Sequence, residues 1–114
     1  MTARDDFGYL GHVRDAVIKI ESYVQGLDEA GFKSNSMVQD AVIRQFEIIG
    51  EAIKQLSAEL TSRDPETPWS SFAKFRDKLI HHYFGVDLDI VWQTIVDDLP
   101  VVRSGVERLL DRST

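Results

Sequence analysis

The spacing of apolar residues between positions 42 and 60 restricts the fold more than any other feature. They recur at alternating steps of four and three residues: Val42, Phe46, Ile49, Ile53, Leu56 and Leu60. This 3.5-residue spacing is typical of an amphipathic helix that packs among other helices. No segment alternates apolar and polar residues as a half-buried strand would. The sequence therefore predicts an all-α protein.

Helical periodicity also covers most of the remaining chain. A first helix is expected over residues 5–27, and a third over residues 68–84, after the loop RDPETP at 63–68. Thr67 and Pro68 are expected as the N-cap and first position of that third helix. Asp87 is expected to cap a fourth helix, and Pro100 to restart the chain as a short fifth one. We expect an antiparallel bundle of four to five helices that forms a single domain, residues 1–114.

Composition excludes several classes of site. The chain has no cysteine, so disulfides, thiolate zinc sites and cysteine nucleophiles are ruled out. The N-terminal residues lack the apolar run of a signal peptide, and no apolar segment is long enough to cross a bilayer. We therefore expect a cytoplasmic protein without membrane contact.

The charge is acidic overall but basic in one place. The formal net charge is −6, which argues against binding to a long DNA duplex through many phosphates. Between positions 74 and 82, three cations (Lys74, Arg76 and Lys78) stand against one anion, Asp77. This local excess of +2 suits a compact anionic ligand or a few nucleotides.

The basic segment continues into RDKLIHHYF, residues 76–84, which holds two of the three histidines. On a helix, Arg76 and Tyr83 are seven residues apart and share a face, while Asp77 and His81 are four apart. The Asp77 carboxylate could then orient the His81 ring. Ile80 and Phe84 form a second apolar patch away from the main stripe, which we interpret as a contact for a second copy of the chain.

Structural interpretations of the same residues stay open from spacing alone. His81 and His82, with Lys78, could form a solvated face, and Tyr83 could be a half-buried core residue. Arg76 could pair with a glutamate of the second helix, Glu47 or Glu51. A metal site is not expected, because adjacent histidines on a helix diverge by about 100° and cannot chelate one ion.

Three segments together resemble one known family. QDAVIRQFEIIGEAIKQL (39–56), PWSSFAKFRDKLIHHYFGVD (68–87) and IVWQTIVDDLP (90–100) follow its order, and Arg-x4-His-x-Tyr falls within the second. This pattern resembles the HEPN superfamily (higher eukaryotes and prokaryotes nucleotide-binding domains), and more narrowly the HepT-type ribonuclease toxins. Arg76, His81 and Tyr83 occupy the motif positions.

The resemblance implies an all-α bundle that forms a two-fold homodimer, with the motif helices of both subunits at a shared cleft. It implies RNA cleavage without a metal or other cofactor, in a type VII-like toxin–antitoxin system. It also implies a partner, a nucleotidyltransferase antitoxin that attaches AMP to Tyr83 and with which the chain could form a hetero-oligomer.

These roles suit the chemistry of the residues. The unperturbed pKa of histidine lies near 6.5, so His81 can exchange a proton near neutral pH, and Arg76 can hold a phosphate as its charge builds. His82 is expected to face solvent or to make a minor phosphate contact, and Lys78 to support substrate binding. Asp77 is expected to support His81, although it also repels phosphate. The alternative function is a non-catalytic dimeric module that binds nucleotides or a partner protein.

Overall fold

The computed structural model describes the backbone of residues 3–81 and 86–112, and the side chains of residues 5–75 and 86–111. Over these residues the chain is helical and contains no strand, which confirms the all-α prediction. No helix in these ranges combines the length and apolarity that a membrane span requires. In chain order the helices are α1 (Ala3–Val24), α2 (Glu29–Lys33), α3 (Ser36–Lys54), α4 (Ala58–Thr61), α5 (Trp69–His81), α6 (Leu88–Gln93), the π-helical turn η1 (Thr94–Asp98) and α7 (Leu99–Arg112).

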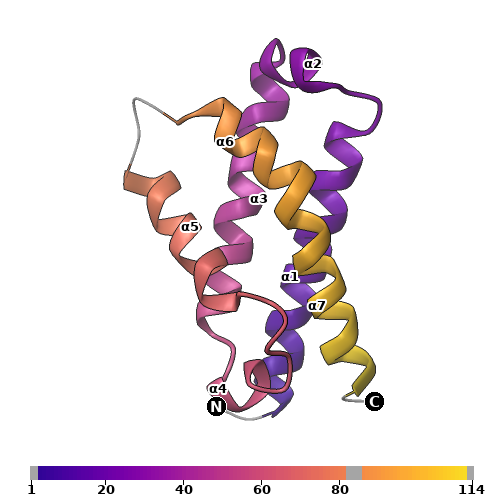
Figure 1. Cartoon of the computed structure of the whole chain (residues 1–114), viewed down its shortest axis with the longest axis vertical. Helices are drawn as coiled ribbons and strands as arrows, with labels where there is room; N and C mark the ends of the chain where they lie inside the picture. Colours follow the sequence, from indigo (N-terminus) through magenta and orange to yellow (C-terminus); the bar gives the residue numbers. More distant parts are fainter. Residues whose placement is uncertain (1–2, 82–85, 113–114) are drawn as a thin grey trace.

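The core lies where α1, α3 and α7 face one another, and α5 packs on α3 from the other side (Figure 1). The apolar stripes expected from the sequence are buried there. Those of α1 and α3 include Leu10, Val13, Val17, Ile20, Val42, Phe46, Ile49 and Ile53. Both termini lie at the end of the molecule that carries α4 (Figure 1). The long seam of the second predicted helix therefore forms the centre of the fold.

The predicted second helix is divided in two. Residues 42–60 were expected to be continuous, but α3 ends at Lys54 and Leu60 belongs to α4. Ser57 begins the new helix, and its hydroxyl oxygen accepts from the backbone N–H of Leu60 at 3.2 Å. The buried carboxylate of Asp6 accepts from the Ser57 N–H at 2.9 Å and from its hydroxyl at 2.7 Å. A contact across 51 residues thus stabilises the break, and periodicity alone could not show it.

The first predicted helix and its exit differ in a similar way. The helix was expected over 5–27, but α1 ends at Val24, and Gly26 follows with a φ of 80° that favours glycine. The segment between α1 and α3 contains a short helix, α2, whose N-cap Asp28 accepts from the Gly31 N–H at 2.7 Å. Asn35 caps α3, since its side-chain oxygen accepts from the N–H of Val38 at 3.1 Å.

The fifth helix expected from Pro100 is present as α7, which begins at Leu99, but no break separates it from the preceding helix. From Leu88 to Arg112 the helical elements follow one another directly, with Pro100 as the second residue of α7. Proline has no N–H to donate to the carbonyl four residues earlier, which normally interrupts a helix. Here the preceding turn widens into η1, and the Leu99 N–H bonds to the carbonyl of Thr94, five residues back. The Asp87 cap is confirmed, since its carboxylate accepts from the N–H of Asp89 at 2.9 Å.

A buried polar cluster fixes the loop that leads into α5. The Thr67 hydroxyl donates to Asp64 Oδ2 at 2.5 Å, and Arg108 Nε donates to Asp64 Oδ1 at 3.1 Å. Arg108 also donates to Thr67 Oγ1 at 3.0 Å. The predicted N-cap role of Thr67 is wrong, because α5 begins at Trp69 and the Thr67 hydroxyl oxygen accepts from Arg108, not from a backbone N–H of the helix. The Pro68 carbonyl instead accepts the helical N–H of Phe72 at 3.4 Å.

Gly105 on α7 lets this cluster form. A Cβ at Gly105 would lie 2.4 Å from Thr67 Oγ1 and 2.9 Å from Asp64 Oδ2. We expect Gly105→Ala to lower the free energy of unfolding by about 1–3 kcal/mol through this overpacking, against the gain that alanine brings to a helix. Urea unfolding tests it, with the exposed neighbour Ser104→Ala as a control expected within about 0.5 kcal/mol of wild type. Equal stabilities of the two variants would contradict the close approach.

Candidate functional site

Helix α5 carries most of the predicted site and is held firmly at its beginning. Trp69 and Phe72 are buried in the core. Phe75 is half-buried and meets Phe46 of α3 edge to face, with ring centroids 5.5 Å apart and an angle of 88° between the rings. Together with the Asp64 cluster, these contacts fix the direction in which α5 leaves the bundle.

The structure places four predicted site residues on this helix. Arg76, Asp77, Lys78 and His81 all have helical backbone in α5, while their side chains are outside the described residues. In an α-helix, positions 76 and 81 are separated by about 7.5 Å along the axis and about 140° around it. Positions 77 and 81 are one turn apart, as the proposed pairing of Asp77 with His81 requires. One helix therefore presents its arginine and histidine positions on different faces.

The other predicted residues of this region are not described. His82, Tyr83 and Phe84 lie outside the described residues, as does the side chain of Ile80. The roles of His82 and Tyr83, and the apolar patch of Ile80 and Phe84, stay predictions. The same holds for the pairing of Arg76 with Glu47 or Glu51.

A hollow of about 300 Å³ lies beside α5, where the helix faces η1. Sequence reasoning did not find it. Phenylalanine side chains form most of its apolar lining, and four polar or charged side chains form the rest. The lining residues are Pro68, Ser71, Phe72, Lys74, Phe75, Thr94 and Asp98. The one signal for it in the sequence was Pro100, because the proline widens the turn that forms the far wall.

Asp98 is the electrostatically unusual group of this hollow. Burial of its carboxyl group raises the pKa of Asp98 above its ordinary value, and the charge of the adjacent Asp97 raises it further. No described residue donates a hydrogen bond to this carboxylate. In contrast, the Thr94 hydroxyl donates to the carbonyl of Ile90 at 2.8 Å. Asp98 is therefore an exposed acceptor at the edge of an apolar hollow, and the hollow removes only part of the water around its carboxyl group.

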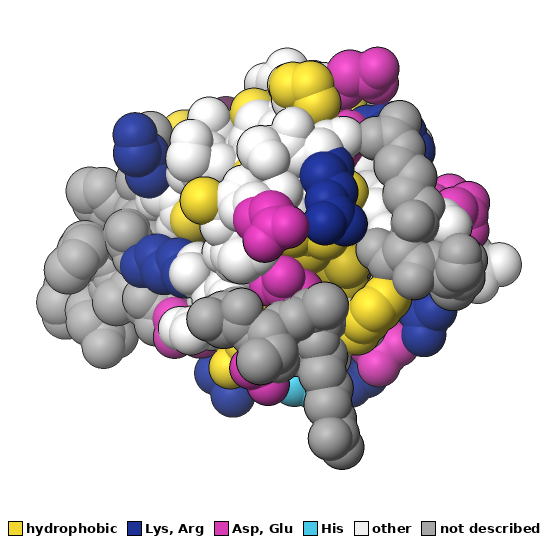
Figure 2. All heavy atoms as spheres, turned by 90° about the horizontal axis from the view of Figure 1, so that it is seen from below, with side chains coloured by type: hydrophobic (Ala, Val, Ile, Leu, Met, Phe, Trp, Pro, Cys, Tyr) yellow, Lys and Arg dark blue, Asp and Glu magenta, His cyan; other side chains and the backbone are white. Residues whose placement is uncertain are grey.

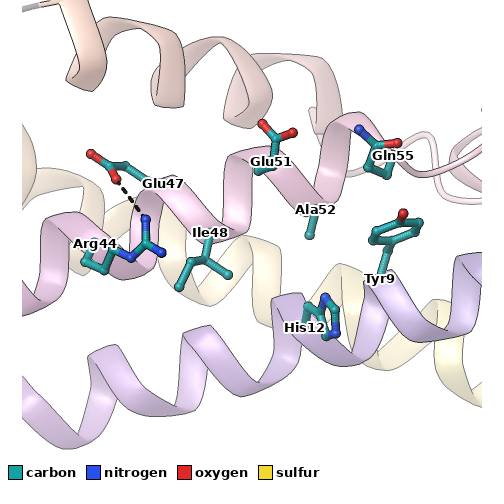
Figure 3. A pocket seen from close by; sticks show the side chains of 8 residues that line it. All are labelled: Tyr9, His12, Arg44, Glu47, Ile48, Glu51, Ala52 and Gln55. Carbon is teal, nitrogen blue, oxygen red and sulfur yellow. Dashed lines mark ion pairs between the residues drawn. The ribbon is translucent and has the colours of Figure 1, made fainter.

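A second and larger groove, of about 470 Å³, runs between α1 and α3 (Figure 3). Tyr9 and His12 of α1 form one wall, with their rings edge to face at 6.1 Å. The wall formed by α3 carries side chains of both signs of charge. Among them, Arg44 Nη1 lies 3.5 Å from Glu47 Oε2. Glu47 and Glu51 extend on the side of α3 away from α1 (Figure 3). Histidine 12, the one histidine outside the predicted site, therefore belongs to a mixed-charge surface groove.

Charge is interspersed elsewhere on the described surface. At the end of the molecule that carries α4, basic and acidic side chains are mixed with apolar and uncharged ones (Figure 2). Arg103 of α7 spans two carboxylates, Glu21 at 2.7 Å and Glu107 at 3.1 Å. Within the described part of the chain, no three His, Asp or Glu side chains converge as ligands for a metal ion.

The family model and the curated proteins that match this chain are all described as ribonucleases or putative ribonucleases. A family model described as "Ribonuclease HepT-like" matches residues 13–109. A Methanocaldococcus jannaschii protein named "Gamma-glutamylcyclotransferase and putative RNase" is 40% identical over 103 residues, which cover 90% of this chain but 46% of that protein. A "Probable ribonuclease HepT" of Thermococcus cleftensis is 40% identical over 101 residues, 89% of this chain and 92% of that one. A "Putative RNase" of Caldanaerobacter subterraneus is 36% identical over 104 residues, 91% and 93% of the two chains. No solved structure matches the chain significantly.

Proposed function

Because the chain belongs to the ribonuclease HepT-like family, we propose that it is a metal-independent endoribonuclease toxin whose catalytic residues are Arg76 and His81. The observation that carries this proposal is the family match over residues 13–109, which includes the whole of α5 and the Arg-x4-His-x-Tyr pattern on it. The relatives named as ribonucleases cover the same region at 36–40% identity.

In the proposed reaction, the ribose 2′-OH next to the scissile phosphate is the nucleophile. His81 of one copy accepts the 2′-OH proton, the 2′ oxygen bonds to phosphorus, and the bond from phosphorus to the 5′ oxygen breaks. The 5′ oxygen takes its proton from His81 of the second copy. Arg76 holds the non-bridging oxygens as negative charge builds on them. The products are a 2′,3′-cyclic phosphate and a 5′-hydroxyl.

This chemistry requires two copies of the chain. Positions 76 and 81 lie on different faces of α5, and one chain supplies one motif histidine, whereas the proposed reaction uses both an acid and a base. We therefore propose a two-fold homodimer of single-domain subunits, residues 1–114, that brings the two α5 helices to one cleft. Two local basic segments then face one phosphate, which offsets the net charge of −6 on each chain.

Regulation is proposed to act through Tyr83. A nucleotidyltransferase antitoxin in the same cytoplasm would attach AMP to the Tyr83 hydroxyl. The added phosphate carries negative charge and bulk to a residue that the sequence pattern groups with Arg76. RNA phosphate would then be excluded from the cleft.

Cleavage in EDTA tests the nuclease proposal. Purified protein incubated with total RNA and an excess of EDTA is expected to give fragments that end in 2′,3′-cyclic phosphate, because neither histidine nor arginine needs a metal. Fragment ends are identified by their resistance to 3′ ligation until the cyclic phosphate is opened and removed. Cleavage that requires an added divalent ion would contradict the mechanism. RNA or nucleotide binding without any fragments would favour the non-catalytic binding module.

A further inference from the structure

The hollow between α5 and η1 lies close to the proposed catalytic residues. Lys74 and Phe75 line it, and they directly precede Arg76 on the same helix. In an α-helix, position 75 is about 9 Å along the axis from position 81. A nucleotide next to the scissile phosphate could therefore reach this hollow while that phosphate stays near His81.

Its lining combines the groups that bind an unstacked base. Phe75 provides a half-buried aromatic ring, on which a base can stack. Lys74 is an exposed cation, and Ser71 is an exposed hydroxyl on the same helix. Asp98, on the opposite wall, is an acceptor without a hydrogen-bond donor among the described residues. Because the Asp98 carboxylate lines the same hollow as Phe75, N–H donors on the edge of a base stacked there could bond to it.

We propose that this hollow is a base-binding subsite that takes one guanine of single-stranded RNA next to the cleaved bond. The proposal rests on the proposed ribonuclease function and adds a preference to it. Guanine presents two parallel N–H donors, N1–H and the 2-amino group, to the two oxygens of Asp98. Its O6 and N7 acceptors suit Lys74 or Ser71. Uracil has one N–H between two carbonyl oxygens, and adenine has no ring N–H on that edge, so both fit Asp98 less well.

The experiment separates binding from cleavage. Full-length His81→Ala protein is titrated with fluorescein-labelled uridine hexamers that hold one central guanosine, inosine or adenosine, or only uridine. We expect the guanosine oligomer to bind about tenfold more tightly than the all-uridine one, since hydrogen bonds to a charged group contribute about 1.5–3 kcal/mol. Inosine lacks the 2-amino group and should bind with intermediate affinity.

Two matched pairs of additional substitutions assign the contacts. In the His81→Ala background, Asp98→Ala is expected to remove the differences between guanosine, inosine and uridine. Asp97→Ala removes the same charge from the adjacent residue, which does not line the hollow, and should preserve those differences. Lys74→Ala should weaken all four oligomers and lower the slope of log affinity against log salt by about 0.7, whereas the exposed Lys19→Ala on α1 should not.

The binding assay tests the guanine subsite, and the cleavage assay tests the nuclease proposal. Equal affinity for guanosine and uridine oligomers, or equal effects of Asp98→Ala and Asp97→Ala, would overturn the subsite. Cleavage of the same oligomers by wild-type protein reports the nuclease separately. Guanine-selective binding through Asp98 without any cleavage would refute the nuclease and support the subsite, and cleavage without guanine preference would refute the subsite alone.

Discussion

Replacing His81 with alanine is expected to lower the rate of RNA cleavage by about 10²–10⁴-fold. The imidazole is the group proposed to move the proton of the 2′-OH and of the leaving oxygen, and general acid–base catalysis contributes gains of this size. Initial rates on one labelled RNA, measured at equal concentrations of folded protein, give the comparison. Circular dichroism and urea unfolding establish that the variant is folded.

Control substitutions show whether the loss of activity is specific to the proposed catalytic residues. His12→Ala removes the histidine in the α1–α3 groove and is expected to cleave at nearly the wild-type rate. Arg76→Ala should cost about 10²–10³-fold, as the loss of one group that stabilises transition-state charge does. The exposed Arg14→Ala on α1 serves as its control. A folded His81→Ala protein that cleaves as fast as His12→Ala would show that the catalytic residues are elsewhere.

The second large effect concerns Tyr83. Incubation of the wild-type protein with the nucleotidyltransferase and ATP is expected to abolish RNA cleavage, because AMP at Tyr83 adds charge and bulk where the phosphate binds. Tyr83→Phe keeps the ring but lacks the hydroxyl that accepts AMP, so it should cleave RNA and resist this inhibition. Intact mass reports the added AMP, and cleavage of labelled RNA reports activity.

The control for this prediction is Tyr23→Phe, which removes a hydroxyl from a half-buried residue of α1. It should remain sensitive to the nucleotidyltransferase. If Tyr83→Phe still gains AMP and loses activity, the modified residue is a different one. If Tyr83→Phe is inactive without any nucleotidyltransferase, the hydroxyl contributes to catalysis or substrate binding as well.

Helical periodicity predicted the fold well where burial decides the structure. The stripes of α1 and α3 and the Asp87 cap are as expected, because each depends on residues within a few turns. The predicted helix boundaries are wrong where a residue distant in sequence, or an unusual turn, determines where a helix begins or ends. Asp6 stabilises the break before α4 from 51 residues away, and Asp64 uses the Thr67 hydroxyl that was expected to cap α5.

In the candidate site, too, some features were predictable from the sequence and others were not. The positions of Arg76, Asp77, Lys78 and His81 on one helix were predictable from the pattern around them, and the structure places all four on α5. The hollow at Asp98 was not predictable, because it requires the widened turn before Pro100 and the position of this turn beside α5. Pro100 was expected to restart the chain as a separate helix, whereas the π-helical hydrogen bond of Leu99 joins α7 to the preceding turn without a break.

The shared cleft is the central claim, and mixed dimers test it most directly. Wild-type and His81→Ala chains carrying different affinity tags are co-expressed, and dimers with one chain of each kind are isolated by two successive purifications. If one cleft uses both histidines as acid and base, the mixed dimer is expected to retain only a few per cent of wild-type cleavage, close to the His81→Ala homodimer. Cleavage at half the wild-type rate would mean that each subunit works alone, and would contradict the account.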